Sequence, residues 1–174
     1  KTDMNFKKIL PHIIAVVAFI VVSLVFFSPV MEGKKLFQSD MAQFDGASKE
    51  LHDYEKASGE GANWANAMFS GMPSYQIAFP QSNNIFNTIA PPLTLWNRNF
   101  DAGIFFIMML GFYVFMCSMG AKPLLSMIAA LAYALGSYNI IIIAVGHITK
   151  AWAMAMIAPI LGGMILVFRR KWLA

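Results

Sequence analysis

The feature that most constrains this chain is the stretch from Ile9 to Val30, which is 22 residues long and contains no Asp, Glu, Lys or Arg. A helix of that length reaches about 33 Å at 1.5 Å per residue, which matches the hydrocarbon core of a bilayer. The stretch is long for the core of a signal peptide, and no small-residue cleavage pattern precedes Met31-Glu32. We therefore predict a transmembrane helix over residues 9–30.

Three further apolar stretches cover residues 102–121, 123–146 and 151–168. The whole chain is 58% hydrophobic and 13% charged, far from the composition of a soluble domain. Glycine and polar side chains interrupt the third stretch at residues 136–139, so we expect that helix to be broken there. The sequence predicts an all-α integral membrane protein with about four transmembrane helices.

Small residues follow one another at four-residue spacing in the third stretch, at Ser126, Ala130 and Ala134. Such rows let helix backbones approach closely inside a membrane. We expect this face to pack against other helices rather than against lipid alone.

The cationic residues predict an orientation. Lysine and arginine accumulate on the cytoplasmic side of membrane proteins. A cytoplasmic N-terminus places seven of them inside: Lys1, Lys7, Lys8, Lys122, Arg169, Arg170 and Lys171. Residues 1–8 and 169–174 are then cytoplasmic, and residues 31–101 form a large extracytoplasmic loop. Eight of the nine acidic residues lie in that loop, and only Asp3 lies inside.

The predicted outer loop has structure of its own. Residues 40–57 lack proline and repeat apolar side chains every three to four positions, which is typical of an amphipathic helix lying along the membrane surface. Aromatic rings suited to the membrane interface follow it at Trp64, Phe69, Tyr75 and Trp96.

Several functional classes are disfavoured. No Asp, Glu, Lys or Arg lies within the predicted spans, which argues against a proton pump or a voltage sensor. The single cysteine, Cys117, excludes an intrachain disulfide and a cysteine-based metal site. The cations do not cluster with exposed aromatics as in a nucleic-acid groove, so we expect no nucleic-acid partner. Phosphate-binding loops, HExxH and glycosylation sequons are absent from the sequence.

Two acidic residues follow the first predicted span, in the sequence QSDMAQFDG. A carboxylate of Asp40 or Asp45 at the membrane surface can act as a general base towards an attacking hydroxyl. A structural role explains the same residues: Asp40 with Gln43 fits a helix N-cap. Asp45 with Lys49 fits an i,i+4 ion pair. On a helix, five residues turn two side chains about 140° apart, so both reach one site only if Asp40 lies at the helix start.

A second candidate group lies between the third and fourth spans, in GHITK. On the outer face, His147 and Lys150 can bind an anion such as a lipid phosphate and balance charge on a leaving group. The alternative is that Lys150 extends to the headgroups while His147 is an ordinary loop residue.

These segments together resemble a known family. FFSPVMEGK (Phe26–Lys34), QSDMAQFDG, KEL, NAMFSGMPSYQI (Asn66–Ile77) and GHITKAWAMA (Gly146–Ala155) look like the start of the YfhO family of bacterial multi-pass membrane proteins. Those proteins are similar to GT-C glycosyltransferases. Ser70 stands where glycine is expected to be common in the family.

The resemblance implies a GT-C-like N-terminal part of a longer chain in the bacterial cytoplasmic (inner) membrane. Asp40, with Asp45 as the less secure position, would serve the active site, and the donor would be a polyprenyl-phosphate-linked sugar for a cell-envelope acceptor. His147 and Lys150 would balance the charge of the leaving lipid phosphate. A divalent metal at Asp40 is conceivable, but a single carboxylate defines no metal site. The competing interpretation is a non-enzymatic multi-pass scaffold or transporter fragment whose outer loop binds a partner.

Overall fold

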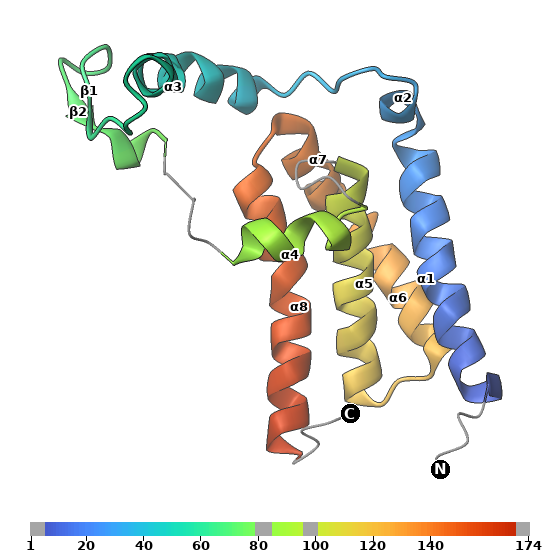
Figure 1. The fold of residues 1–174 in the computed structure, drawn as a ribbon. Helices are drawn as coiled ribbons and strands as arrows, with labels where there is room; N and C mark the ends of the chain where they lie inside the picture. The colour runs from blue at the N-terminus through green and yellow to red at the C-terminus, as the bar shows by residue number, and fades with distance from the viewer. Residues whose placement is uncertain (1–5, 79–84, 96–100, 170–174) are drawn as a thin grey trace.

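The computed structural model describes residues 6–78, 85–95 and 101–169. Its ribbon is a bundle of helices with one helix lying crosswise over its end (Figure 1). The helices are α1 (Phe6–Phe26), α2 (Ser28–Met31), α3 (Ser39–Ser58), α4 (Phe86–Leu93), α5 (Asp101–Met119), α6 (Pro123–Ala134), α7 (Ser137–Val145) and α8 (Ile148–Phe168). Between α3 and α4 lie the strands β1 (Trp64–Ala65) and β2 (Met72–Pro73) and the 3-10 helix η1 (Ser74–Gln76). The residues Lys1, Asp3, Trp96, Arg170 and Lys171, considered above, lie outside the described part.

Three helices, α1, α5 and α8, are long and apolar enough to cross a membrane. The pair α6 and α7 passes the same test jointly and bends by 48° at its break, which makes up to four spans. The predictions of a largely helical chain with three to four candidate membrane-spanning helices, and of a break in the third apolar stretch, are therefore confirmed. At the break, the Asn139 side chain donates a hydrogen bond of 2.6 Å to the carbonyl of Tyr133 and so satisfies a group freed by the missing helical turn.

The ends of the spans differ from the prediction. Helix α1 begins at Phe6 and ends at Phe26, because Phe27 leaves the helical conformation and Pro29 starts the separate turn α2. Helix α5 already begins at Asp101, and α8 at Ile148. These helices therefore extend beyond the predicted spans and include four charged residues in their first turns: Lys7, Lys8, Asp101 and Lys150.

The most buried helix is α5, which packs between α1, α6 and α8. Small residues bring α5 and α8 close together. A Cβ atom built on Gly111 would lie 2.7 Å from the carbonyl oxygen of Ala155, and one built on Gly162 would lie 3.0 Å from the Ser118 hydroxyl. Backbone contact of this kind replaces the hydrophobic effect as the source of helix association in lipid.

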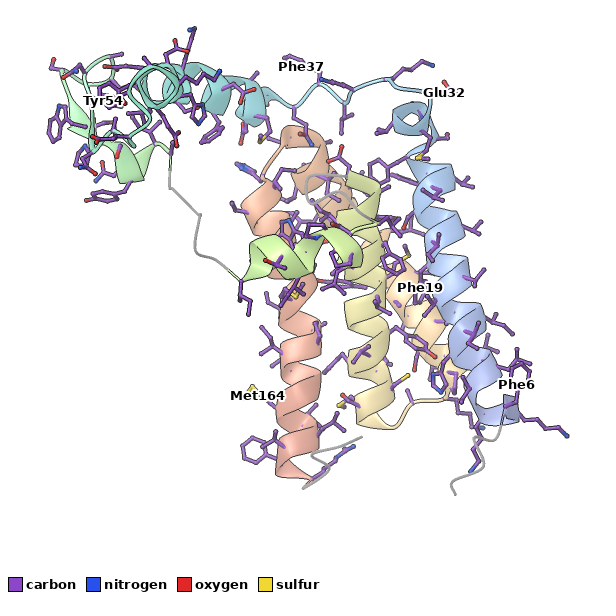
Figure 2. All side chains as sticks on the ribbon, in the orientation of Figure 1. Phe6, Phe19, Glu32, Phe37, Tyr54 and Met164 are labelled. Atoms are coloured by element: carbon purple, nitrogen blue, oxygen red, sulfur yellow. The ribbon has the colours of Figure 1, made fainter. Side chains whose placement is uncertain are left out.

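The remaining helices complete the core. Phe19 of α1 is fully buried and points into the bundle, whereas Met164 of α8 is half exposed and points away from it (Figure 2). The row of small residues on α6 is fully buried, as the sequence predicts, at Ser126, Ala130 and Ala134. A polar contact also joins α1 to α5, because the Tyr113 hydroxyl lies 2.6 Å from His12 Nδ1.

The two ends of the bundle carry different elements (Figure 1). The start of α1, the α5–α6 turn and the end of α8 lie at one end, where the Arg169 guanidinium donates to the Ser118 carbonyl at 2.9 Å. Helices α2, α3 and α7 lie at the opposite end. Helices α2 and α3, which come from the segment predicted as an outer loop, therefore lie at the same end of the bundle as α7, while which end faces the cytoplasm stays a prediction.

The predicted amphipathic helix over residues 40–57 is present as α3. It buries Ser48 and Leu51 and ends at Gly59, whose φ of 75° is the left-handed conformation common in helix C-caps. The rings predicted for an interface are exposed, with 53% of Trp64, 84% of Phe69 and 61% of Tyr75 accessible.

Candidate functional site: an aspartate–histidine pair

The turn between α7 and α8 sets the position of His147. Helix α7 ends at Gly146, whose φ is 98°. The N–H of Gly146 donates to the carbonyl of Ile143, and the N–H of His147 donates to that of Ile142, each at 3.1 Å. These two bonds form a Schellman motif, which fixes the direction in which the chain leaves the helix. His147 is consequently held at a defined place as the residue that precedes α8.

The first turn of α3 packs directly on this glycine. A Cβ atom on Gly146 would lie 2.8 Å from Gln38 Cβ and 3.1 Å from Met41 Cγ. The Gln38 amide nitrogen also donates to Asp101 Oδ1 at 3.1 Å and to the Ile143 carbonyl at 2.7 Å, so one side-chain amide joins α3 to both α5 and α7. Asp101 is 8% exposed, and this bond satisfies a buried carboxylate oxygen. The docking places Asp40, two residues later, over the α7–α8 turn.

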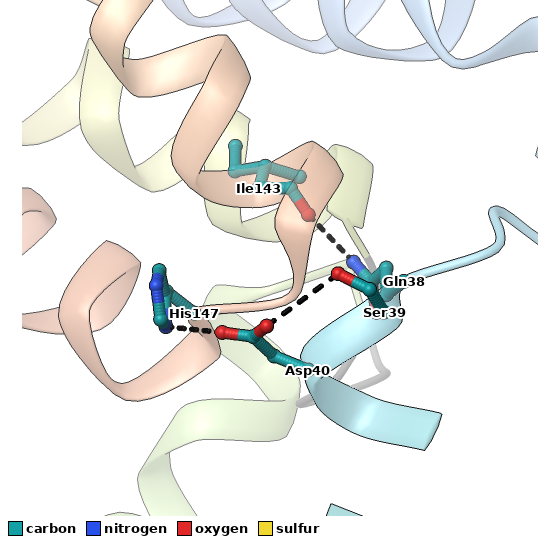
Figure 3. Close-up of polar contacts among 5 residues, drawn as sticks. All are labelled: Gln38, Ser39, Asp40, Ile143 and His147. Atoms are coloured by element: carbon teal, nitrogen blue, oxygen red, sulfur yellow. Dashed lines mark hydrogen bonds and ion pairs between the residues drawn. The ribbon is translucent and has the colours of Figure 1, made fainter. Parts of the chain in front are cut away.

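The two sequence-predicted site residues meet at this junction. His147 Nδ1 lies 2.8 Å from Asp40 Oδ2, and the remaining oxygen, Oδ1, accepts a long hydrogen bond of 3.4 Å from the Ser39 hydroxyl (Figure 3). The side chains are 33% and 50% exposed for Asp40 and His147, so the pair is accessible. The contact needs the proton on Nδ1, which leaves Nε2 for a second partner.

Both structural explanations offered for the acidic residues are wrong. The N-cap of α3 is Gln38, and Asp40 lies inside the first turn, where a negative charge is favourable towards the helix dipole. Asp45 does not pair with Lys49, because the Lys49 ammonium contacts the carboxylate of Asp53 one turn further along the helix. Lys49 is equidistant in sequence from both aspartates, and only the fold decides between them.

Asp40 lines one end of a cleft of about 490 Å³ between α3 and the β1–β2 hairpin, which we call the α3–hairpin cleft. Its volume is within the range of small-molecule sites, roughly 300–1,000 Å³. Amide and aromatic side chains line the rest of it, among them Gln43, Phe44, Phe69 and Gln76. These four residues were missed by sequence reasoning, since nothing in their spacing indicates that the hairpin folds back on α3. Asp45 is not among the lining residues.

The other predicted binding residue, Lys150, lies near the pair in sequence but has a different contact. Its ammonium group lies 5.2 Å from the ring centroid of Tyr138, at the start of α7. This cation–π contact keeps the positive charge of Lys150, on α8, next to helix α7. Within the described residues, no group of three or more His, Cys, Asp or Glu side chains is placed to hold a metal ion.

The hairpin wall of the cleft is attached to α3 by one carboxylate. Glu50 accepts hydrogen bonds from the backbone N–H of Ala67 at 2.8 Å and of Asn66 at 3.1 Å. These bonds favour the ionised form and lower the pKa of Glu50 below its usual 4.5. The hairpin also has strained backbone, since Phe69 and Ser70 adopt positive φ values of 48° and 61°.

Comparisons with protein-family models, with curated proteins and with solved structures found no match to this chain.

Proposed function

We propose that the protein is a GT-C-like glycosyltransferase of the YfhO type, acting at the outer face of the bacterial cytoplasmic membrane. It transfers a sugar from a polyprenyl-phosphate donor to a cell-envelope acceptor. In this proposal the N-terminus is cytoplasmic, and the end of the bundle with α2, α3 and α7 faces outwards.

The observation that carries the proposal is the 2.8 Å contact between Asp40 and His147. These residues are 107 positions apart and come from two of the segments that resemble the family. Their pair adjoins the α3–hairpin cleft, at the end of the bundle where a lipid-linked substrate presents its headgroup. A carboxylate oriented by an imidazole is a recurrent arrangement for moving a proton.

The chemistry proposed is an inverting transfer. Asp40 takes the proton of an acceptor hydroxyl as the oxygen attacks the anomeric carbon, and the bond from that carbon to the phosphate oxygen breaks. His147 orients the carboxylate through Nδ1 and, with Lys150, balances the negative charge that develops on the leaving phosphate. The amides of Gln43 and Gln76 supply hydrogen bonds to sugar hydroxyls, while Phe44 and Phe69 offer apolar faces to a sugar ring. Asp45 is retained as a secondary candidate.

Substitution of Asp40 by asparagine tests the catalytic role. The amide keeps the size of the side chain and can still contact His147, but it no longer accepts the proton, so the transfer rate should fall by about 10²- to 10⁴-fold. The measurement is sugar transfer from a polyprenyl-linked donor by the full chain in membranes, normalised to folded protein. Glu55→Gln, on the same helix and outside the residues that line the cleft, is the control and should change the rate little. Asp45→Asn tests the secondary candidate.

Two results would count against the proposal. A wild-type rate for Asp40→Asn would show that the pair is structural. Absence of any donor-dependent labelling by the wild-type protein would instead favour the scaffold or transporter alternative, in which the α3–hairpin cleft binds a partner.

A further inference from the structure

A second cleft lies at the same end of the bundle, on the other side of Gln38. It has a volume of about 390 Å³ and opens between the end of α1, the turn α2 and helix α7. Its walls are apolar, with Phe26, Phe27 and Val30 from the first segment and Ile140 and Ala144 from α7. The aromatic wall is rigid, because the ring of Phe26 stacks on Phe105 at 5.3 Å and Phe27 meets the same ring edge-on at 5.7 Å.

The rim of this cleft is cationic. Lys34 and Lys35 line it, and no described acidic residue does. One carboxylate, that of Glu32, lies 2.7 Å from the Lys34 ammonium and is itself largely exposed. Two lysines opposed by one glutamate leave one net positive charge at the mouth of an apolar slot. A slot of this composition matches a molecule with one apolar chain and one negatively charged headgroup.

The position of the cleft agrees with that chemistry. It lies at the end of α1, a helix long and apolar enough to cross a membrane, and the end of such a helix is where lipid headgroups are expected. Lysines at this level place their ammonium groups among headgroup phosphates while their stems contact apolar surface.

We propose that this lysine-rimmed cleft binds an anionic glycerophospholipid of the bilayer, with one acyl chain between α1 and α7 and the phosphate at Lys34 and Lys35. Such a lipid braces α7 from the side opposite to α3. Ile143 links the two sites, because its side chain lines the cleft and its carbonyl holds Gln38, two residues before Asp40. The proposal does not depend on glycosyl transfer, since the cleft does not include the Asp40–His147 pair.

The test measures which lipids stay bound. The full chain is placed in nanodiscs of equal parts phosphatidylglycerol and phosphatidylcholine and then extracted into detergent. The lipids retained on the folded protein are quantified by mass spectrometry. Wild type should retain phosphatidylglycerol preferentially. Lys34→Gln with Lys35→Gln should lower that preference by about fivefold or more, the effect expected for each lysine near an anionic headgroup.

Further variants separate charge from shape. Glu32→Gln should raise the preference for phosphatidylglycerol, because it removes the opposing charge, and it keeps the test usable if the lysine variant fails to fold. Ala144→Trp should reduce the retention of both lipids by filling the cleft. Lys49→Gln with Lys56→Gln removes the same charge from α3 and should change nothing.

Three outcomes would overturn the proposal. The first is unchanged retention in the Lys34 and Lys35 variant, and the second is an equal loss in the control on α3. The third is displacement of phosphatidylglycerol by added polyprenyl monophosphate at one tenth of its amount, which would assign the cleft to a prenyl lipid instead.

Discussion

The helical bundle and the segment from α3 to η1, which we call the α3–η1 segment, are held together by different forces. In the bundle, α5 and α8 meet through glycine and alanine backbones, and most of α5 is buried. In the α3–η1 segment, α3 buries two residues, and the hairpin is attached through hydrogen bonds to the carboxylate of Glu50. Close packing makes the bundle intolerant of added volume, whereas the α3–η1 segment is sensitive to charge and to local backbone conformation. The candidate site lies where these two regions join.

The largest effect is expected at the junction, for Gly146→Ala. The new side chain would meet Gln38 and Met41, and the residue would keep a φ of 98°. The left-handed conformation costs about 1–2 kcal/mol. The steric contact adds roughly 1–3 kcal/mol. We expect α3 to separate from the bundle, measured as faster hydrogen exchange in the first turn of α3 and a lower unfolding temperature.

Gly120→Ala is the control for this prediction. Gly120 has a similar φ of 93°, but nothing lies within 4 Å of a Cβ at that position. It should show the conformational cost without detaching α3. Equal exchange rates in the two variants would mean that the packing on Gly146 contributes nothing.

The next largest effect is expected on the stability of the bundle. Gly111→Ala places a Cβ 2.7 Å from the Ala155 carbonyl, which forces α5 and α8 apart at a cost of about 1–3 kcal/mol in the free energy of unfolding. Gly163→Ala on α8 meets no atom within 4 Å and should stabilise the helix by up to about 1 kcal/mol, because alanine favours a helix more than glycine does. Folded yield and thermal unfolding in detergent measure both. Equal stability of the two variants would contradict the close α5–α8 contact.

A smaller effect, on the stability of the β1–β2 hairpin, is expected from a change of pH. Because the folded-state pKa of Glu50 is lowered below 4.5, its hydrogen bonds stabilise the hairpin above that pH and are lost as the pH falls further. Amide exchange at Asn66 and Ala67, corrected for intrinsic rates, should therefore rise on acidification. Glu50→Gln should raise exchange at neutral pH, whereas Glu55→Gln on the same helix should not. If amide exchange in the hairpin does not change with pH, the attachment of the hairpin through Glu50 is contradicted.

The smallest effect is a gain. Ser70 has a φ of 61°, a conformation that glycine adopts without strain. Relief of that strain is partly offset by the greater freedom of glycine in the unfolded chain, so Ser70→Gly should stabilise the hairpin by less than about 1 kcal/mol. Ala57→Gly within α3 should have the opposite sign, since glycine weakens a helix by up to about 1 kcal/mol. If hydrogen exchange shows that both Ser70→Gly and Ala57→Gly destabilise the hairpin, the positive φ of Ser70 is not a source of strain.

The membrane architecture could be predicted from the sequence because bilayer thickness imposes a length and a composition on every span. Residues 9–30, 102–121 and 151–168 were each recognisable for that reason, and the break at residues 136–139 followed from glycine and polar side chains in an apolar run. The exact ends were not predictable. Where Phe27 leaves the helix, and where Asp101 joins one, depends on neighbouring elements such as Pro29 and Gln38.

The site shows the same division. The sequence by itself indicated four candidate residues, Asp40, Asp45, His147 and Lys150, since charged and imidazole groups beside apolar spans are few and chemically conspicuous. Only the tertiary structure brought Asp40 and His147 to 2.8 Å, through the turn at Gly146 and the docking of Gln38. In the tertiary structure Lys49 also pairs with Asp53 rather than with Asp45, and the hairpin folds over α3 to form a cleft. Sequence patterns indicate whether each residue prefers water or the apolar interior of a membrane. Contacts between distant residues depend instead on how the helices pack, and no local sequence pattern determines that packing.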